Sequence, residues 1–229
     1  FISFETRLLL SEMNLLKVSS LSDLGICQVE FLNRMLGKVK RTPQMKTGEK
    51  HHEKLTEGLE KISDEDIIRF VKNGDKFDVR EVFVKSDKTR LIGRIDQINF
   101  LGFKKGLRHK GTRNLAIILD DKFTRKNHFE IPNYYKLQLT GYSTALGSDS
   151  RFEDLVDVVG VKLSFHDIET REHMNTFEVD SNTLDSWENK ISKVVNEGLK
   201  ILDKQKAEHK GFNIENGTWE DCWKHKGFI

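Results

Sequence analysis

The chain has 229 residues, of which 37% are hydrophobic and 32% are charged. This length suffices for one sizeable domain with its own core, and the composition is typical of a polar globular protein. No run approaches the roughly 18 consecutive apolar residues that a membrane-spanning helix needs, so we expect no membrane partner. Two cysteines, Cys27 and Cys222, make no disulfide framework. They favour a reducing, intracellular location: the cytoplasm, or the nucleus or an organelle in a eukaryote.

Basic residues gather in two stretches, although the net charge is only +2. Five basic residues and no acid lie between Arg34 and Lys46, and the same holds between Leu101 and Leu119. Either run alone is typical of a solvated loop. Because the two runs bracket Asp96, a candidate metal ligand, they favour contact with the phosphates of a nucleic acid.

The first part of the chain, at about residues 19–73, is predicted to be helical. One helix begins at a serine cap within residues 19–22 and runs to about Leu36. A second begins at Thr47-Gly48 and continues to Ile62. Ser63 and Asp66 form a capping box for a short third helix, which Asn73-Gly74 ends because both residues tolerate the left-handed conformation.

From Asp78 the apolar pattern takes a period of two, which predicts strands in a core at about residues 78–180. A helix beginning near Pro132 interrupts the strands, and another beginning at a Ser181 cap opens the C-terminal part, residues 181–229. The predicted strands are Val79–Lys85, Arg90–Phe100, the buried Leu115–Asp121, Leu155–Phe165 and Glu172–Val179. We therefore predict one α/β domain over residues 1–229.

Two of these strands deliver acids. Asp120 and Lys122 are two residues apart at the end of a buried strand and should share a face, while Asp121 points away. A hard oxygen ligand beside a cation is what a magnesium-dependent hydrolase needs, although such a triplet also fits a solvent-exposed strand end. Asp96 lies within an apolar strand, where it serves either as a metal ligand or as a salt-bridge partner of Arg94.

Other candidate residues lie before and after these acids. His51 and His52 are adjacent on a helix and point about 100° apart, so one of them at most faces a given site. Gln138 and Tyr142 are four residues apart and share a helix face. Glu81, on the strand before Asp96, either joins the acids or faces outward.

The order of these elements resembles the RecB-like branch of the PD-(D/E)XK nuclease superfamily. The four matching elements are Gly48…His52, Gly93-Arg94-Ile95-Asp96, the strand ending in Asp120-Asp121-Lys122, and Gln138…Tyr142. Within that branch the chain looks most like exonuclease V and the CRISPR adaptation nucleases. The resemblance covers about residue 21 to the C-terminus. It implies a restriction-endonuclease-like core, with a mixed central β-sheet flanked by α-helices.

The resemblance also implies a site. His52, Asp96, Asp120 and the backbone carbonyl of Asp121 would bind Mg²⁺ or Mn²⁺, and Lys122 would act with Asp96 and Asp120 in catalysis. Expected DNA contacts are Gln138, Tyr142, Lys104, Lys105, Arg108 and Arg41. The implied reaction is hydrolysis of phosphodiester bonds, mainly in single-stranded DNA and in an exonucleolytic manner, for DNA repair or CRISPR spacer acquisition. A catalytically silent DNA-binding or assembly subunit is the alternative.

A 4Fe–4S cluster is a further implication of the resemblance. Cys27 matches an upstream cluster cysteine, and Cys222 matches the first cysteine of a C-terminal group. At the position of the next cysteine this sequence has His225. Either these residues form an altered cluster, or both thiols are small buried side chains.

Overall fold

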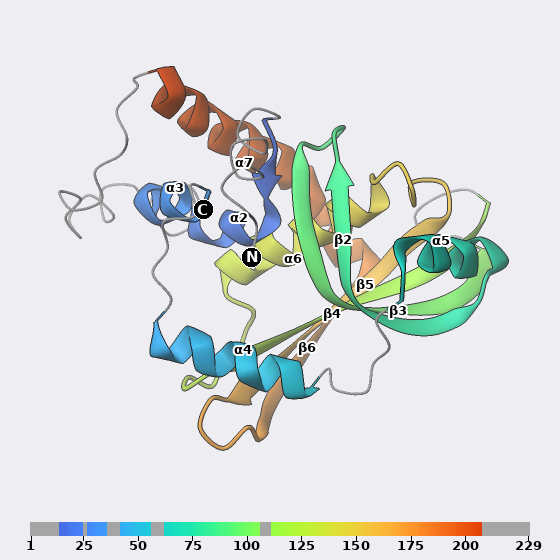
Figure 1. Cartoon of the computed structure of the whole chain (residues 1–229), viewed down its shortest axis with the longest axis horizontal. Helices are drawn as coiled ribbons and strands as arrows, with labels where there is room; N and C mark the ends of the chain where they lie inside the picture. Colours follow the sequence, from blue (N-terminus) through green and yellow to red (C-terminus); the bar gives the residue numbers. More distant parts are fainter. Residues whose placement is uncertain (1–13, 25–26, 36–41, 56–61, 106–110, 208–229) are drawn as a thin grey trace.

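The computed structural model describes residues 14–24, 27–35, 42–55, 62–105 and 111–207. A six-stranded mixed sheet lies at its centre, in the order β1-β3-β4-β5-β6, and β2 pairs with β3 (Figure 1). The strands are β1 (Leu16–Lys17), β2 (Lys76–Ser86), β3 (Leu91–Lys105), β4 (Thr112–Thr124), β5 (Val156–Asp167) and β6 (His173–Asp180). The predicted α/β class, a mixed sheet flanked by helices, is confirmed.

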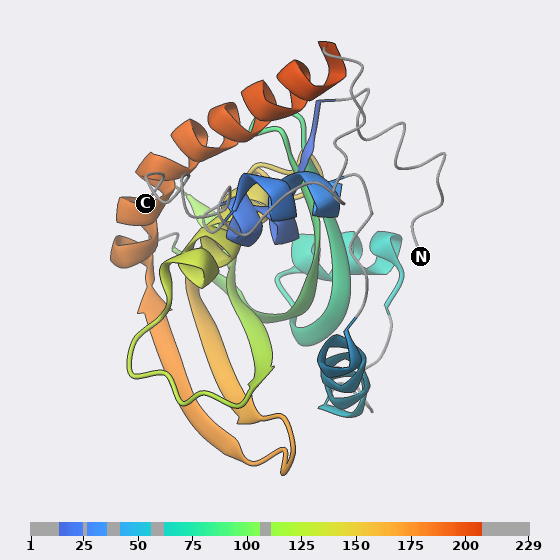
Figure 2. The same ribbon diagram turned by 90° about the vertical axis from the view of Figure 1, so that its left-hand side faces the viewer.

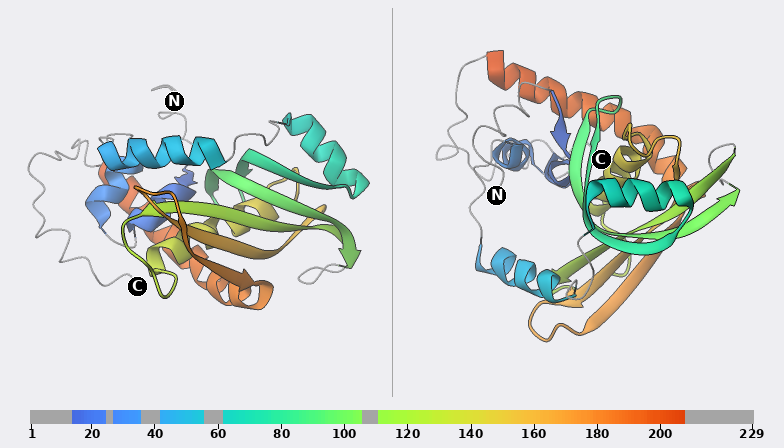
Figure 3. Two further views of the ribbon diagram at one scale, coloured as in Figure 1. Left: turned by 90° about the horizontal axis from the view of Figure 1, so that it is seen from below. Right: turned by 45° about the vertical axis from the view of Figure 1, so that its right-hand side comes forward.

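Helices cover both faces of this sheet. They are α2 (Val18–Leu24), α3 (Gln28–Met35), α4 (Pro43–Leu55), α5 (Asp64–Asn73), α6 (Asn133–Gly147) and α7 (Ser181–Ala207). Figure 3 shows α4 and α5 on one side of the sheet, and α6 and α7 on the other. α2 and α7 both pack on α6, and α7 runs along the outside of the molecule (Figure 2).

β4 is the central strand, as its apolar sequence predicted. It pairs antiparallel with β3 and parallel with β5, and α6 connects β4 to β5. Ala116 and Ile118 are completely buried. A parallel neighbour requires a long crossover connection, so a helix necessarily lies over the face of β4 that it crosses. This connection brings the α6 side chains next to the end of β4.

The predicted first helix is wrong as a single element, because the structure has two helices, α2 and α3. Cys27, the first described residue after α2, is not helical. The proposed serine caps are also wrong. Ser20 and Ser22 lie inside α2, where their hydroxyls donate to the carbonyls of Lys17 and Ser19 at 2.6 and 2.9 Å.

Three other boundaries differ from the prediction. α4 begins at Pro43, earlier than Thr47, and Thr42 Oγ1 accepts a hydrogen bond from the Met45 N–H at 3.2 Å. Proline suits a first helical turn, where its missing N–H would have no partner. Asp180 rather than Ser181 caps α7, since its carboxylate accepts from the Thr183 N–H at 2.9 Å. In the second basic run, which was predicted to be a loop between Phe100 and Leu115, β3 continues to Lys105 and β4 begins at Thr112.

The capping box of α5 is confirmed. The Ser63 hydroxyl accepts a hydrogen bond from the Asp66 N–H at 3.2 Å, and Gly74 ends the helix at a φ of 74°. This cap orients α5 so that Ile67 and Val71 are buried. The helix therefore covers the β2–β3 pair.

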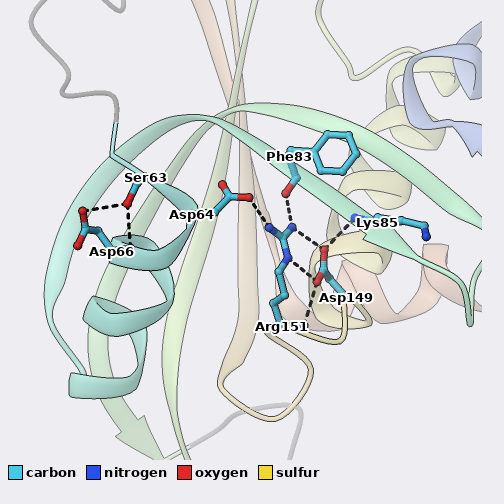
Figure 4. A network of polar contacts seen from close by, with 7 residues as sticks. All are labelled: Ser63, Asp64, Asp66, Phe83, Lys85, Asp149 and Arg151. Atoms are coloured by element: carbon cyan, nitrogen blue, oxygen red, sulfur yellow. Dashed lines mark hydrogen bonds and ion pairs between the residues drawn. The ribbon is translucent and has the colours of Figure 1, made fainter. Parts of the chain in front are cut away.

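A buried ion pair ties the end of α6 to β2 (Figure 4). Asp149 is 1% exposed, and Arg151 donates to it from Nε at 3.0 Å and from Nη2 at 2.8 Å. The Lys85 N–H also donates to Asp149, at 2.8 Å. Arg151 further contacts the carboxylate of Asp64 at 2.7 Å and the carbonyl of Phe83 at 2.5 Å. The guanidinium thus joins α5, β2 and the turn after α6.

We predict that Arg151→Ala lowers the free energy of unfolding by about 2 to 4 kcal/mol, and the Tm by roughly 5 to 15 °C, because it leaves a buried carboxylate poorly paired. Lys88→Ala is the matched control. It removes an ion pair to Glu153 at 2.7 Å whose side chains are 71% and 42% exposed. Solvent screens such a pair, so the Tm should not change. Equal melting of the two variants would contradict the role of Arg151.

Acid should weaken the same contact. Burial by itself raises the pKa of Asp149, but hydrogen bonds from Arg151 and the Lys85 N–H outweigh it and hold the pKa below its usual value. The contribution to stability is therefore present above about pH 4 and is lost as the pH falls through the lowered pKa.

Candidate active site

Asp96 and Asp120 lie where β3 and β4 separate. The last pair of the β3–β4 ladder on this side is Gln97 with Leu119, so Asp96 and Asp120 occupy the next position in register. Beyond them, the same β3 pairs through Leu91 and Ile92 with β1. The two strands diverge after Gln97, and the two carboxylates lie at the fork.

Asp120 and Lys122 project together from β4, as the alternation of the strand predicted. Lys122 Nζ lies 2.8 Å from Asp120 Oδ1, and the two side chains are 19% and 2% exposed. Asp121 points to the opposite face, where its Oδ1 lies 2.9 Å from Nε2 of His166 on β5. The end of β4 thus offers a carboxylate and an ammonium on one face and a hydrogen-bonded carboxylate on the other.

Charge in the fork is unbalanced. The pKa of Asp120 is raised to about 6. Burial is the largest cause, Lys122 lowers the pKa, and the nearby Asp96 raises it through its charge and a shared hydrogen bond. Burial by itself lowers the pKa of Lys122, but the charges of Asp120 and Asp96 outweigh it and raise that pKa above its usual value. Two carboxylates therefore face one ammonium that stays protonated at neutral pH.

α6 forms the third wall of the fork. Gln138 and Tyr142 are buried, and Gln138 Nε2 donates to the Tyr142 hydroxyl at 3.5 Å, so they share a face as predicted. Burial raises the pKa of Tyr142, and the charges of Asp96 and Asp120 add to the rise. This neutral phenol lies close to both acids. Such burial suits a bracing role; DNA contact by Gln138 and Tyr142 stays a prediction.

Close packing explains why position 93 is a glycine. A Cβ at this position would lie 3.0 Å from Tyr142 Cε1 and 3.2 Å from Val18 Cβ. Both separations are tighter than ordinary carbon contacts, so a side chain would displace Tyr142 or α2. The glycine of the Gly93…Asp96 pattern lets α6 approach β3 closely.

Of the two adjacent histidines, the structure describes only the side chain of His51. It is 8% exposed, its Nε2 lies 3.1 Å from the carbonyl of Ile168, and its ring packs at 5.1 Å on Phe123. Its Nδ1 is buried without a hydrogen-bond partner. Phe123 has the parity of Asp121, so α4 covers the face of β4 opposite Asp120. The side chain of His52 lies outside the described residues.

Other predicted residues divide into two groups. The carboxylate of Glu81 is 45% exposed and lies 3.8 Å from Arg94, so it faces outward as one alternative held. Lys104 is exposed on the extended β3. The predicted residues that lie outside the described part of the chain are Arg41, Arg108, Cys222 and His225, together with the side chain of Lys105.

Some basic residues serve the fold. Arg34, from the first basic run, pairs with the buried Asp23 of α2. Arg113, from the second run, donates to the carbonyl of Glu153. Cys27 is 2% exposed, and its N–H donates to the Asp23 carbonyl at 2.7 Å. These positions account for part of each run without any ligand.

Two features of the fork suit a hard divalent cation. Asp120 Oδ2 is buried and has no hydrogen-bond partner, and the excess negative charge favours a cation. Within the described ranges, no cluster of three or more His, Cys, Asp or Glu side chains is arranged to hold a metal. Magnesium commonly binds one or two carboxylates and completes its shell with water and substrate phosphate, so this pair of acids fits it.

Sequence reasoning missed three contacts made around the end of β4. Tyr135 places its ring 5.5 Å from Lys122 Nζ, and burial raises the pKa of this phenol to about 12. His166 contacts Asp121, and His51 contacts Phe123. Tyr135 was accessible from the sequence, since it precedes Gln138 by three residues on one helix. The two histidines were not, because their contacts cross from one element to another.

No protein-family model and no curated protein matches the chain. Among solved structures, it is similar to a protein of Eubacterium rectale named "Putative exonuclease", at 11% identity and a TM-score of 0.46, covering 85% of this chain and 83% of that one. It is also similar to an alkaline exonuclease, LHK-Exo, of Laribacter hongkongensis, at 11% identity and a TM-score of 0.38, covering 90% and 98%. At these values the likeness decides neither family nor activity. None of the described helices is long and apolar enough to span a membrane.

We predict that Asp120→Asn stabilises the metal-free protein, raising the free energy of unfolding at pH 7.5 by about 1 to 3 kcal/mol. The variant leaves one carboxylate for one ammonium. Wild-type Asp120 has a folded pKa of about 6 against 3.8 in the unfolded chain, so its folded state binds the proton more tightly. Wild-type stability should rise as the pH falls from 6 to 4, and the advantage of the variant should disappear below about 4.

Denaturant unfolding in EDTA across this pH range provides the measurement. Asp121→Asn is the control, because Asp121 has the same chemistry on the other face of β4 and contacts His166. It should give no gain. A less stable Asp120→Asn at pH 7.5 would show that the fork is not electrostatically strained.

Proposed function

We propose that the chain is a metal-dependent DNA nuclease that hydrolyses phosphodiester bonds. The observation that carries this proposal is the fork itself, where the buried Asp120, the half-buried Asp96 and a protonated lysine lie close together. Buried like charges are costly, so a pair of carboxylates beside one ammonium needs a reason. Coordination of a divalent cation beside a phosphate group would explain this arrangement, because the two carboxylates would bind the cation and Lys122 would face the phosphate.

Asp96 and Asp120 would hold the metal, with the backbone carbonyl of Asp121 and the His52 side chain as the proposed further ligands. His51 is not proposed as a ligand, because its ring packs on Phe123 at the face of β4 opposite Asp120. When bound, Mg²⁺ or Mn²⁺ would polarise the phosphate and lower the pKa of water.

Lys122 acts as a cation rather than as a base. Its raised pKa keeps it protonated at neutral pH, so it cannot accept the proton that the attacking water releases. Its ammonium is held at 2.8 Å by Asp120, in position to donate to a phosphate oxygen. Charge that builds up on the phosphate during attack is then offset by a group that needs no reorganisation.

Single-stranded DNA is the proposed substrate, and the proposed action is exonucleolytic, in DNA repair and processing or CRISPR spacer acquisition. Lys104, Lys105, Arg108 and Arg41 are the proposed phosphate contacts, which would bind with little sequence readout. The 4Fe–4S cluster at Cys27 and Cys222 stays a prediction.

A catalytically silent DNA-binding or assembly subunit is the second candidate. The burial of Gln138 and Tyr142 would serve such a scaffold equally well. The protonated lysine beside two acids favours the nuclease, because a subunit that only binds DNA has no need for two carboxylates held close together with one of them buried.

We expect the purified protein to degrade 5′-labelled single-stranded DNA with Mg²⁺ or Mn²⁺ and not in EDTA. Lys122→Ala should lower the rate by at least about 100-fold, because it removes the cation that offsets phosphate charge. Lys200→Ala is the control, since this lysine is 72% exposed on α7 and should leave the rate unchanged. Cleavage by Lys122→Ala at the wild-type rate would exclude the mechanism, and binding without cleavage would favour the silent subunit.

Metal binding has its own measurement, independent of turnover. At ten times its dissociation constant, Mn²⁺ should stabilise the wild type by about 1.4 kcal/mol, which is a rise in Tm of roughly 3 to 6 °C. Asp120→Asn should show little rise. The shift should shrink below pH 6, where Asp120 takes up a proton that competes with the cation. An equal shift in wild type and variant would place the metal elsewhere.

A further inference from the structure

An exposed aromatic ring lies in the connection that follows β4, the strand of Asp120 and Lys122. Phe129, in the connection between β4 and α6, is 90% exposed. The other exposed large hydrophobic side chains among the described residues are Phe83 and Phe103, at 44% and 46%. A single exposed apolar residue needs no explanation, but one almost fully displayed next to a candidate active site does.

Neighbouring residues hold Phe129 in this position. The His128 ring packs at 4.5 Å on Phe165 of β5, and the Asn175 side chain of β6 donates to the His128 carbonyl at 3.0 Å. Two residues after Phe129, Ile131 is 8% exposed. His128 contacts β5 and β6, and Ile131 is buried in the core, so the backbone is held on both sides of Phe129 while the Phe129 ring is exposed to solvent.

The His128 contact lies on the face of the sheet that carries Asp120 and Lys122. Phe165, which His128 contacts, is the register partner of Lys122 in the parallel β4–β5 pair, and register partners point to one face. Tyr135 joins the same group, at 5.7 Å from the Phe165 ring and 5.5 Å from Lys122 Nζ. Figure 2 shows the connection running from the end of β4 to the start of α6.

The surrounding charge suits an anionic chain. From Lys122 to Lys136 there are four basic residues and one acid, Glu130. Arg125 and Lys126 are the first residues of the connection. The exposed ion pair of Arg125 with Glu169, at 3.0 Å, is one that a phosphate can replace at little cost. A ring displayed among cations offers both parts of single-strand recognition, base stacking and phosphate attraction.

We propose that Phe129 is a nucleobase-stacking site, on which a strand that enters the fork lays one unstacked base. This inference rests on the proposed function and adds a source of strand preference to it. Bases inside a duplex have both faces covered by their neighbours, so only a single strand or a frayed end can use the ring. Phe129 therefore selects single-stranded substrate at a point outside the metal-binding residues.

The test is fluorescence anisotropy with labelled dA12, with a blunt duplex, and with a dA12 analogue that carries abasic residues, all in Ca²⁺ buffer. Phe129→Ala should bind dA12 at least about 10-fold more weakly, within the effect known for one stacked base. Its duplex affinity should be unchanged. Phe129→Trp should keep wild-type affinity, and Phe129→Leu, which is apolar but has no ring, should behave as Phe129→Ala.

Phe83→Ala is the matched control, because it removes an exposed phenylalanine on β2. It should bind dA12 like the wild type. The abasic strand should bind wild type and Phe129→Ala equally, since it offers no base to stack. Wild-type affinity in Phe129→Ala, or in Phe129→Leu, would overturn the stacking site while a wild type that binds and cleaves DNA keeps the proposed function. A wild type that neither binds nor cleaves any of these DNAs would overturn both.

Discussion

Divergence of β3 from β4 is the constraint on which the candidate site depends. Up to Gln97 and Leu119 the two strands pair backbone to backbone, and one residue later they part. At that point the position that would have been the next ladder pair is occupied by two acids. Because antiparallel register brings facing residues close together, two carboxylates 24 residues apart in sequence are held within hydrogen-bonding reach. Lys122 then follows on the face of Asp120.

Two carboxylates held this close together need rigid surrounding structure. Carboxylates of like charge repel, and the fork would open if its walls could move. α6 forms one wall, and it is tied at its end through Asp149 and Arg151 to β2 and α5 (Figure 4). The absence of a side chain at Gly93 allows Tyr142 to pack directly on β3. The apolar core and one buried ion pair thus keep the acids together.

The two faces of β4 carry different groups. Asp120 and Lys122 point toward α6 and the loop that presents Phe129, so the proposed chemistry and strand selection share one face. Asp121 and Phe123 point toward the other, where His166 and His51 pack against them. Alternation along a single strand therefore places Asp120 and Lys122 on one side of the backbone, and the residues that contact His166 and His51 on the other. A shift of the elements packed on either face of β4 would therefore move Asp120, Asp121 and Lys122 together.

Local sequence was sufficient for much of this protein. Apolar patterns predicted β2 to β6, with β4 predicted from a short, largely apolar run. Spacing predicted that Gln138 and Tyr142 share a face, and the D-x-K spacing predicted that Asp120 and Lys122 point together. Such features follow from backbone periods that a single element obeys alone. Tertiary structure decided the rest: the fork that joins Asp96 to Asp120, the pKa of about 6 for Asp120, the packing of His51 and His166 behind β4, and the exposure of Phe129. Those properties depend on which elements pair, where pairing stops and how much water is excluded, and no period within one element contains that information.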